Sequence, residues 1–320
     1  MSAPAPKILI TGGLGQLGRA LSTRLGAAGQ AEIAALGRGA LDVTDRSAVR
    51  ARISAERPGV VIHAAAMTDV DACERDPDAA FRANALGVLH VAQAADEVRA
   101  RFVFISTDFV FDGEKPSPYY ETDAPNPLSV YAESKLAGER YALGAAHRAL
   151  VVRTAWLYGP GGRNFVDTIL DAGVAAGAAP GAAGGAAAAD AATKTPAKPL
   201  RVVADQAGSP TSAPDFADGI ARVLDAGLVG VVHLVNAGHA TRYELARRAL
   251  DFAGLERVAV EPITTAEMPR PARRPRHAVL GSRVLGAAGI APLRSWEEAL
   301  AAHVAARTSM ATKTTRRNAR

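Results

Sequence analysis

The chain has 320 residues, of which 48% are hydrophobic and 22% charged, and its formal net charge is +5 at pH 7. This size and composition predict a globular protein with one large or two modest domains and a buried core. Four of the five net positive charges lie in the last nine residues (312–320), which contain no acid. The rest of the chain is nearly neutral, and no stripe of aromatic residues accompanies the charge, so we expect no nucleic-acid partner.

The same composition argues against disulfides and membrane segments. Cys73 is the only cysteine, so neither an intramolecular disulfide nor a multi-cysteine metal site can form, which suits a reducing cytoplasm. The N-terminal stretch "MSAPAPKILITGG" lacks the charged start and long apolar core of a signal peptide. The Ala/Gly-rich stretch 172–192 is interrupted by Pro180 and Asp190, so we expect no membrane partner and a cytoplasmic location.

In the first half of the chain, apolar runs of strand length alternate with segments of helical period. The expected strands are 7–11, 32–36, 59–66, 101–107 and 149–159, and the expected helices are 15–27, 48–57, 78–99 and one beginning near Tyr131. This alternation is typical of a parallel sheet covered on both faces. It predicts an α/β, Rossmann-like, doubly wound domain over residues 1–160, to which later segments return.

The second half alternates less regularly and predicts a smaller, mixed C-terminal substrate lobe over residues 161–307. After the stretch 164–177 the sequence changes to a low-complexity insertion at about 176–198, which we expect to be a disordered surface segment. Order resumes at 200–206. Further expected elements are helices near 215–226, 242–253 and 295–307 and a strand at 230–236. We expect the basic tail, 308–320, to be disordered.

The first expected strand leads directly into "TGGLGQLG", where Gly12, Gly15 and Gly18 have a spacing found in dinucleotide-binding loops. Glycines let the backbone turn tightly and approach a pyrophosphate, while the following helix supplies free N–H groups and a favourable dipole. After the second strand, where NAD-specific sites commonly carry an acid, the chain has Arg38. This favours the extra phosphate of NADP, although Arg38 could also be a solvated loop residue. Asp42 is a candidate for the adenosine contact, with a turn-capping role as the alternative.

The stretch "SVYAESK" puts Tyr131 and Lys135 four residues apart, on one face of a helix. We expect the ammonium group to lower the pKa of the phenol, which would make Tyr131 a general acid near neutral pH. An exposed helix face is the alternative reading. Upstream, Ser106, Thr107 and Asp108 end a buried strand at the sheet edge where ligands bind. A hydroxyl there could polarise a substrate carbonyl, and local capping is the simpler role.

Together these motifs resemble the dTDP-4-dehydrorhamnose reductase family, within the extended short-chain dehydrogenase/reductase superfamily. The resemblance covers most of residues 7–305 and rests on "TGGLGQLG", "STDFVFDG", "YAESKLAGE", "RTAWLYGPGGRNFV" and "DQAGSPT". It implies hydride transfer from NADPH, or less strictly NADH, to the 4-keto carbon of a dTDP-6-deoxy-hexulose. The expected reaction converts dTDP-4-dehydro-L-rhamnose to dTDP-L-rhamnose.

The resemblance also implies roles for individual residues. Tyr131 would be the proton donor, Lys135 would bind the nicotinamide ribose and tune Tyr131, and Thr107 would assist at the carbonyl. The cofactor contacts would be Gly15, Gln16 and Leu17 at the pyrophosphate, Asp42 and Val43 at the adenosine, and Ala65, Ala66 and Met67 at the inner face. Trp156 would contact the sugar beside Thr107 and Asp108. Asn164 and Arg274 are weaker candidates for the nucleotide half of the substrate.

The sequence departs from the family at three places. Phe109 stands where a tyrosine is usual, and the insertion at about 176–198 lengthens one connection. Ala20 occupies the place of a helix glutamate that bridges dimers through a metal in some members, so we predict no metal.

Alternatives with the same motifs are a nucleotide-sugar epimerase or dehydratase, a reductase of another 4-ketosugar, and a non-catalytic regulatory subunit that keeps the fold. Intact Thr107, Tyr131 and Lys135 argue against the last. A homodimer is compatible with the sequence, which does not require one.

Overall fold

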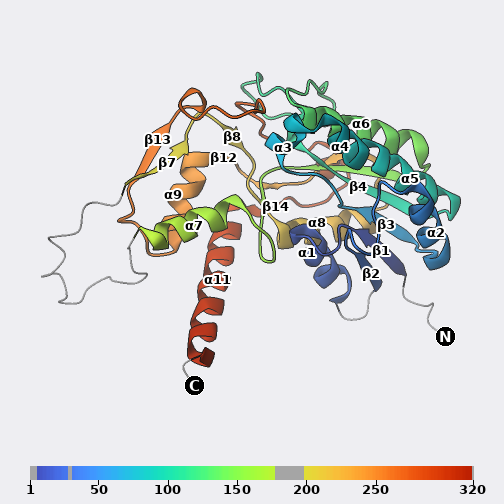
Figure 1. Ribbon diagram of the computed structural model, residues 1–320, viewed down its shortest axis with the longest axis horizontal. Coiled ribbons are helices and arrows are strands. Elements are labelled where there is room, and N and C mark those ends of the chain that lie inside the picture. The colour runs from blue at the N-terminus through green and yellow to red at the C-terminus, as the bar shows by residue number, and fades with distance from the viewer. Residues whose placement is uncertain (1–5, 28–30, 177–197, 319–320) are drawn as a thin grey trace, which may run out of the picture.

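A six-stranded parallel sheet forms the centre of the molecule (Figure 1). The computed structural model describes residues 6–27, 31–176 and 198–318, and only the backbone of 310–318. In spatial order the strands are β10 (Gly230–His233), β5 (Ala149–Thr154), β4 (Arg101–Thr107), β3 (Val60–His63), β1 (Lys7–Thr11) and β2 (Glu32–Leu36). All five pairings are parallel. The predicted Rossmann-like doubly wound sheet is confirmed, and β10 joins it from late in the chain.

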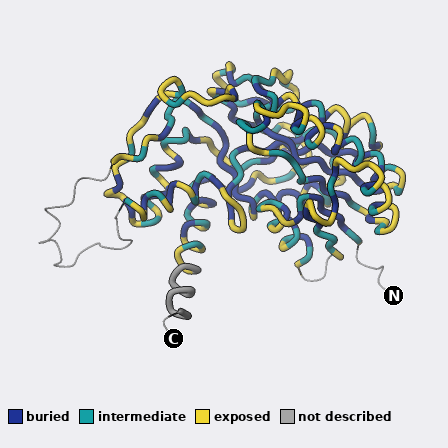
Figure 2. Tube along the Cα trace, in the orientation of Figure 1, coloured by how far each residue is buried: buried dark blue, intermediate teal, exposed yellow. Residues whose placement is uncertain are grey.

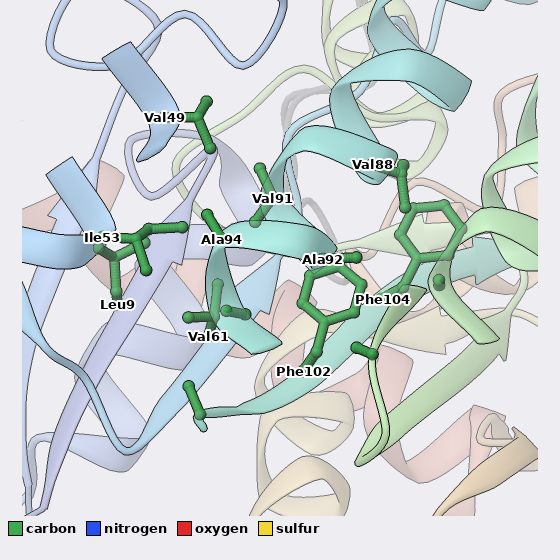
Figure 3. Close-up of a cluster of buried hydrophobic side chains, with 14 of the residues drawn as sticks. Leu9, Val49, Ile53, Val61, Val88, Val91, Ala92, Ala94, Phe102 and Phe104 are labelled. Atoms are coloured by element: carbon green, nitrogen blue, oxygen red, sulfur yellow. The ribbon is translucent and has the colours of Figure 1, made fainter. Parts of the chain in front are cut away.

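Helices cover both faces of the sheet because successive side chains of each strand point to opposite sides. On one face, Leu9, Val61 and Phe102 pack against α2 (Arg46–Glu56) and α5 (Gly87–Glu97) (Figure 3). On the other face, the neighbouring strand residues Ile8, Ile10 and Ile62 join α1 (Gln16–Leu25) and α8 (Ala213–Asp225). Figure 2 shows buried residues concentrated along the sheet and exposed ones at the rim.

The connection between β3 and β4 is more broken than the sequence predicts. In place of one helix at 78–99, the structure has α3 (Val70–Arg75), α4 (Pro77–Phe81), the π-helix η2 (Arg82–Leu86) and α5. Asp69 and Asp76 cap α3 and α4 through hydrogen bonds to backbone N–H groups. Single-turn π segments are frequent at functional sites because they re-aim side chains within a helix.

The expected single strand at 149–159 is also interrupted. The strand β5 ends at Thr154, and Trp156 then takes a left-handed backbone conformation with φ 45°. The chain resumes as β6 (Leu157–Tyr158), which pairs with β9 (Thr211–Ser212). The reason is tertiary: β6 leaves the main sheet to form a separate pair with β9, which lies more than 50 residues later in the chain. The predicted strand was therefore wrong across Ala155 and Trp156.

The second lobe lies beside the sheet domain, at the left of Figure 1. Its elements are α7 (Phe165–Ala175), β7 (Leu200–Val203), β8 (Ala207–Gly208), β11 (Asn236–Ala237), β12 (Ala240–Thr241), α9 (Arg242–Phe252), β13 (Val260–Ile263), η4 (Thr265–Glu267) and α11 (Trp296–Asn318). The late elements α10 (Val284–Ala287) and β14 (Leu293–Ser295) contribute Leu285 and Leu293 to the core of the sheet domain. Two buried clusters hold α7, α9 and α11 together. The insertion predicted at 176–198 falls almost wholly outside the described residues.

The C-terminal helix α11 contradicts the expectation of a disordered tail at 308–320 as far as Asn318. Ser295 and Glu298 cap its start reciprocally, and the helix contains no Gly or Pro that would end it. Arg307 binds Asp167 of α7 at 2.6 Å. In Figure 1 the last turns of the helix project away from both lobes. Within the described part of the chain, no helix has the length and hydropathy to cross a membrane.

Helix α6 (Val130–Ala145) packs closely on η2, and Gly138 makes this approach possible. A Cβ at Gly138 would collide with the backbone oxygen of Asn84. We predict that Gly138→Ala lowers the free energy of unfolding by about 1–3 kcal/mol, measured by urea denaturation. The control is Gly144→Ala on the same helix, where a Cβ meets nothing within 4 Å. It should stabilise by about 0.5–1 kcal/mol, and equal effects of the two changes would contradict the packing argument.

Candidate functional site

A cleft of about 740 Å³ opens at the carboxyl ends of β1, β3, β4 and β5. It is lined by every residue predicted to contact the cofactor: Gly12, Gly15, Gln16, Leu17, Gly18, Arg38, Asp42, Val43, Ala65, Ala66, Met67, Tyr131 and Lys135. Thr107, Asp108 and Trp156 line it as well. Residues from six separate parts of the chain meet here because parallel strands bring their following loops to the same edge.

The glycines of the first loop are required by close contacts. Gly12 has φ 67°, and a Cβ on it would lie 2.7 Å from the amide nitrogen of Ala65. A Cβ on Gly18 would collide with the backbone of Gly12 and Gly13. Gly15 caps α1 without any side-chain hydrogen bond, and the first turn of α1 contains no acid. The free N–H groups of this helix start fit the pyrophosphate of a dinucleotide.

Arg38 and Asp42 lie at the far end of the cleft, after β2. The side chain of Arg38 is 88% exposed, and its Nε lies 3.5 Å from Asp42 Oδ2. Asp42 also accepts hydrogen bonds from the backbone and hydroxyl of Thr44, which lower its pKa. Asp42 thus has the turn-capping role, one of the two roles predicted for it. The guanidinium group of Arg38 remains accessible to a ligand.

Asn84 of η2 is a buried positioning residue that the sequence analysis missed. Its side chain accepts from the backbone N–H of Met67 at 2.8 Å and donates to the Met67 carbonyl at 3.0 Å. It also donates to the hydroxyl of Ser134 on α6. These bonds fix the inner wall of the cleft to the helix that carries Tyr131. In the sequence, Asn84 is a polar residue within a segment whose apolar residues recur at helical spacing, and this could have indicated its role.

Tyr131 lies in the first turn of α6, which begins at Val130 after the N-cap Ser129. Its ring packs edge-on against Phe109 at 5.8 Å between centroids. Burial raises the pKa of the phenol above its ordinary value, and the nearby hydroxyl of Thr107 lowers it by less. The phenol is therefore protonated at neutral pH, the form that a general acid needs.

The expected effect of Lys135 on Tyr131 is not what the structure shows. Lys135 is buried, its Nζ donates to the Ile105 carbonyl at 2.7 Å, and it lies 4.1 Å from the centre of the Phe104 ring. Burial lowers the pKa of Lys135 to about 7, which the charge of Glu139 partly opposes. The prediction that this ammonium lowers the pKa of Tyr131 was wrong for this geometry, because burial dominates for both groups.

A buried ion pair lies one helical turn beyond Lys135. Glu139 accepts from Arg153 Nε at 2.9 Å and from Nη2 at 2.6 Å, and both side chains are almost fully buried. Ser106 donates its hydroxyl to Glu139 at 2.5 Å. Ser106 therefore serves this network, and Thr107 is the hydroxyl at the end of β4 that lies next to Tyr131. The cluster joins β4, β5 and α6 beneath the cleft.

Two polar atoms of the cleft have no hydrogen-bond partner within the described part of the chain. Asp108 is only 2% exposed, and its Oδ1 accepts from Thr107 at 3.0 Å, while its Oδ2 has no partner. Burial raises the pKa of Asp108 to about 7. The hydroxyl of Thr154 is also buried and unpartnered. Unsatisfied buried polar atoms are costly, so they indicate that a ligand binds here.

The three other predicted substrate residues differ in their placement. Trp156 lines the cleft, whereas Asn164 and Arg274 do not. Asn164 caps α7 and donates to Gln16 at 3.2 Å, which joins the second lobe to the phosphate loop. Arg274 binds Asp71 at 3.0 Å. Arg163, which the sequence analysis did not select, lines the cleft from the loop before α7.

Within the part of the chain that the structure describes, no three His, Cys, Asp or Glu side chains are arranged to hold a metal ion. The absence of a metal remains a prediction.

The fold and the cleft define the class of the protein. A glycine loop between a first strand and a first helix, facing a tyrosine, a lysine and a threonine at the same sheet edge, is typical of NAD(P)-dependent oxidoreductases of the short-chain dehydrogenase/reductase type.

Comparisons with known proteins identify the family within this class. The family model described as RmlD substrate binding domain matches residues 6–177 and 190–309. A dTDP-4-dehydrorhamnose reductase of Mycobacterium tuberculosis is 38% identical over 314 residues, which cover 96% of this chain and 95% of that protein. The chain belongs to the dTDP-4-dehydrorhamnose reductase family.

Solved structures agree with this assignment. A dTDP-4-dehydrorhamnose reductase from Clostridium acetobutylicum has a TM-score of 0.85 and 37% identity, and the alignment covers 94% of this chain and 99% of that one. The enzyme of the same name from Bacillus anthracis, solved in complex with NADP, has a TM-score of 0.84 and 34% identity over 95% of this chain and 99% of that one.

The buried Glu139–Arg153 pair generates a prediction about stability. Glu139→Gln should lower the free energy of unfolding by about 3–5 kcal/mol, because it leaves the Arg153 charge buried and unpaired. Urea denaturation measures this change. Glu133→Gln on the same helix removes an exposed carboxylate and should change stability by less than about 0.5 kcal/mol. A loss below about 1 kcal/mol for Glu139→Gln would contradict the assigned role of the pair.

Proposed function

We propose that this protein reduces the 4-keto group of dTDP-4-dehydro-L-rhamnose to give dTDP-L-rhamnose, with NADPH as the preferred cofactor and NADH as a poorer one. The observation that carries the proposal is the meeting of Tyr131 and Thr107 with the glycine loop in one cleft. The names of the relatives and the NADP bound to one of them support it.

When bound, NADPH supplies the hydride that the carbonyl carbon accepts. Tyr131 donates its phenolic proton to the carbonyl oxygen, which becomes the new hydroxyl, and the raised pKa of the phenol keeps that proton available at neutral pH. Thr107 would orient the carbonyl oxygen by donating to it the hydroxyl proton that otherwise goes to Asp108. Lys135, which donates to the Ile105 carbonyl, would donate to a ribose hydroxyl of the cofactor.

The cofactor phosphates and the sugar would be held by different residues of the cleft. Gly12, Gly15 and Gly18 with the start of α1 would hold the pyrophosphate, and Arg38 would bind the 2′-phosphate of NADP. Trp156 and Asp108 would contact the hexulose. Asn164 is engaged as a cap and Arg274 by Asp71, so each would reach the nucleotide half of the substrate only by rearranging.

Residues 1–160 form mainly the nucleotide-binding domain and residues 161–307 mainly the substrate lobe in this proposal. A homodimer and a cytoplasmic location also remain proposals. The insertion at 176–198 stays unassigned.

The deciding experiment is coupled conversion of dTDP-4-keto-6-deoxyglucose by a 3,5-epimerase and this protein, with the product identified by NMR. We expect NADPH to be consumed only when the 4-keto sugar is present and dTDP-L-rhamnose to form. The purified protein should release its nicotinamide cofactor. Tightly retained NAD with no net consumption would favour an epimerase or dehydratase, another product sugar would favour a sister reductase, and no turnover would favour a regulatory subunit.

The proton donor can be tested by a single change. Tyr131→Phe should lower kcat by roughly 100-fold or more, in line with typical general-acid contributions, and leave NADPH affinity near normal because the backbone loop is untouched. Stopped-flow or steady-state oxidation of NADPH measures the first effect and fluorescence titration the second. Tyr141→Phe, at a 39% exposed position on the same helix, is the control. Unchanged turnover in Tyr131→Phe would eliminate the assigned role.

The proposed contact of Arg38 with the 2′-phosphate can be tested by comparing the binding of NADPH and NADH. Arg38→Ala should weaken NADPH binding by about 10-fold and NADH binding hardly at all, since a charge-assisted hydrogen bond to the 2′-phosphate is lost. Titration of both nucleotides gives the ratio. Arg50→Ala, which removes an exposed arginine paired with Glu97 outside the cleft lining, should leave the ratio unchanged. If Arg38→Ala weakened both nucleotides equally, Arg38 would not read the 2′-phosphate.

A further inference from the structure

Arg242, the first residue of α9, is a cation with no assigned role. Its Cζ lies 3.6 Å from the centre of the Trp156 ring and 5.0 Å from that of Phe165. Burial lowers its pKa to about 10, so the guanidinium is charged at neutral pH. In the described part of the chain its side chain has no hydrogen-bond or ion-pair partner within the usual limits. A guanidinium carries five N–H donors, so these donors are available to a ligand or to water.

Asp108, near Arg242, has a free hydrogen-bond acceptor that complements the free donors of Arg242. The unpartnered Oδ2 of this 2% exposed side chain is an acceptor without a donor. The two groups are close enough for each charge to shift the pKa of the other. They do not form an ion pair, because no nitrogen of Arg242 lies within 4.0 Å of an Asp108 carboxylate oxygen. Asp108 and Trp156, on which Arg242 stacks, line the same cleft, so the donors of Arg242 and the free acceptor of Asp108 lie beside one ligand-binding space.

The combination of free donors on Arg242 and a free acceptor on Asp108 favours a hydroxyl group. A hydroxyl can accept from Arg242 and donate to Asp108 at the same time. A phosphate would satisfy Arg242 but would bring a second negative charge toward Asp108, and an apolar ring edge would leave both groups unsatisfied. Thr107, which bonds Asp108, and Trp156, which stacks on Arg242, are the residues that the proposed function places around the hexulose.

Arg274 does not provide the same donors. Its Nη2 binds Asp71 at 3.0 Å, and its Nη1 binds the Ala272 carbonyl at 2.9 Å. The Arg274 charge also acts on Arg242, because it lowers the pKa of Arg242. Of these two neighbouring guanidinium groups, Arg242 is therefore the one whose donors are free among the described residues.

We propose that Arg242 and Asp108 together recognise a ring hydroxyl, at C2 or C3, of the 4-keto sugar. Arg242 is then a specificity-determining residue, with the indole of Trp156 as the platform that holds its guanidinium in place. This inference rests on the proposed function and specifies which sugar ring the site selects.

The test compares three substrates and four proteins. The substrates are the dTDP-4-keto-6-deoxy sugar and its 2-deoxy and 3-deoxy analogues, and the proteins are the unaltered enzyme, Arg242→Met, Arg242→Lys and Arg248→Met. NADPH oxidation gives kcat/KM for each pair, and calorimetry gives the affinity for dTDP. Arg248, exposed on the same helix and 5.8 Å from the Phe252 ring, is the matched charge-removal control. Circular dichroism confirms that each variant is folded.

We expect Arg242→Met to lower kcat/KM for the fully hydroxylated sugar by about 10- to 100-fold, the range for a hydrogen bond to a charged group. One deoxy analogue should be nearly insensitive to the change, and that analogue identifies the hydroxyl. Arg242→Lys should recover part of the loss, because it keeps the charge without the planar fork. The affinity for dTDP and the behaviour of Arg248→Met should not change.

The outcomes separate this inference from the proposed function. A parallel loss of dTDP affinity would place Arg242 at the diphosphate and overturn the inference. Equal losses for all three sugars, or no loss, would also overturn it while leaving the reductase activity established. If the unaltered enzyme reduced none of the sugars, the proposed function would fail and this inference with it.

Discussion

The buried ion pair between Glu139 and Arg153 is the interaction on which the site depends. Glu139 belongs to α6 and Arg153 to β5, and Ser106 of β4 donates to the same carboxylate. Because two bonds from a rigid guanidinium fix the carboxylate, the start of α6 cannot rotate or slide over the sheet without breaking them. Tyr131 and Lys135, two turns and one turn before Glu139, are positioned by this constraint. Asn84 adds a second attachment, from η2 to both α6 and the inner wall of the cleft.

Burial has opposite consequences for the two members of the Tyr/Lys pair. It raises the pKa of Tyr131 and lowers that of Lys135, since a low-dielectric site disfavours the charged form of each. A reductase needs a phenol that carries its proton when the carbonyl is reduced, so the raised pKa suits the proposed direction of reaction. The unpartnered Asp108 oxygen, the free donors of Arg242 and the left-handed Trp156 also depart from ordinary local rules. Such departures are concentrated at functional sites because a ligand, or the surrounding packing, compensates for them.

The parts of this structure that follow from local chemistry were predictable. The strand before "TGGLGQLG" and the helix after it are present at β1 and α1, and all the predicted cofactor residues line one cleft. The failures have long-range causes. Pairing of β6 with β9 breaks the strand at Trp156, and η2 interrupts the helix expected at 78–99 where it packs on α6. At the other end of the chain, α11 continues through residues expected to be disordered.

By itself the sequence determined the alternation of strands and helices, the phosphate loop and the residues of the catalytic motif, because these depend on neighbours within a few positions along the chain. Only the tertiary structure decided which charged side chains are paired with another residue and which can bind a ligand. Arg274 lies in a basic motif but is paired with Asp71, 203 residues away in the chain, while Arg242 belongs to no motif and stacks on Trp156 beside the cleft. Burial and pairing are properties of the packed chain, and they determine protonation and hydrogen-bonding capacity.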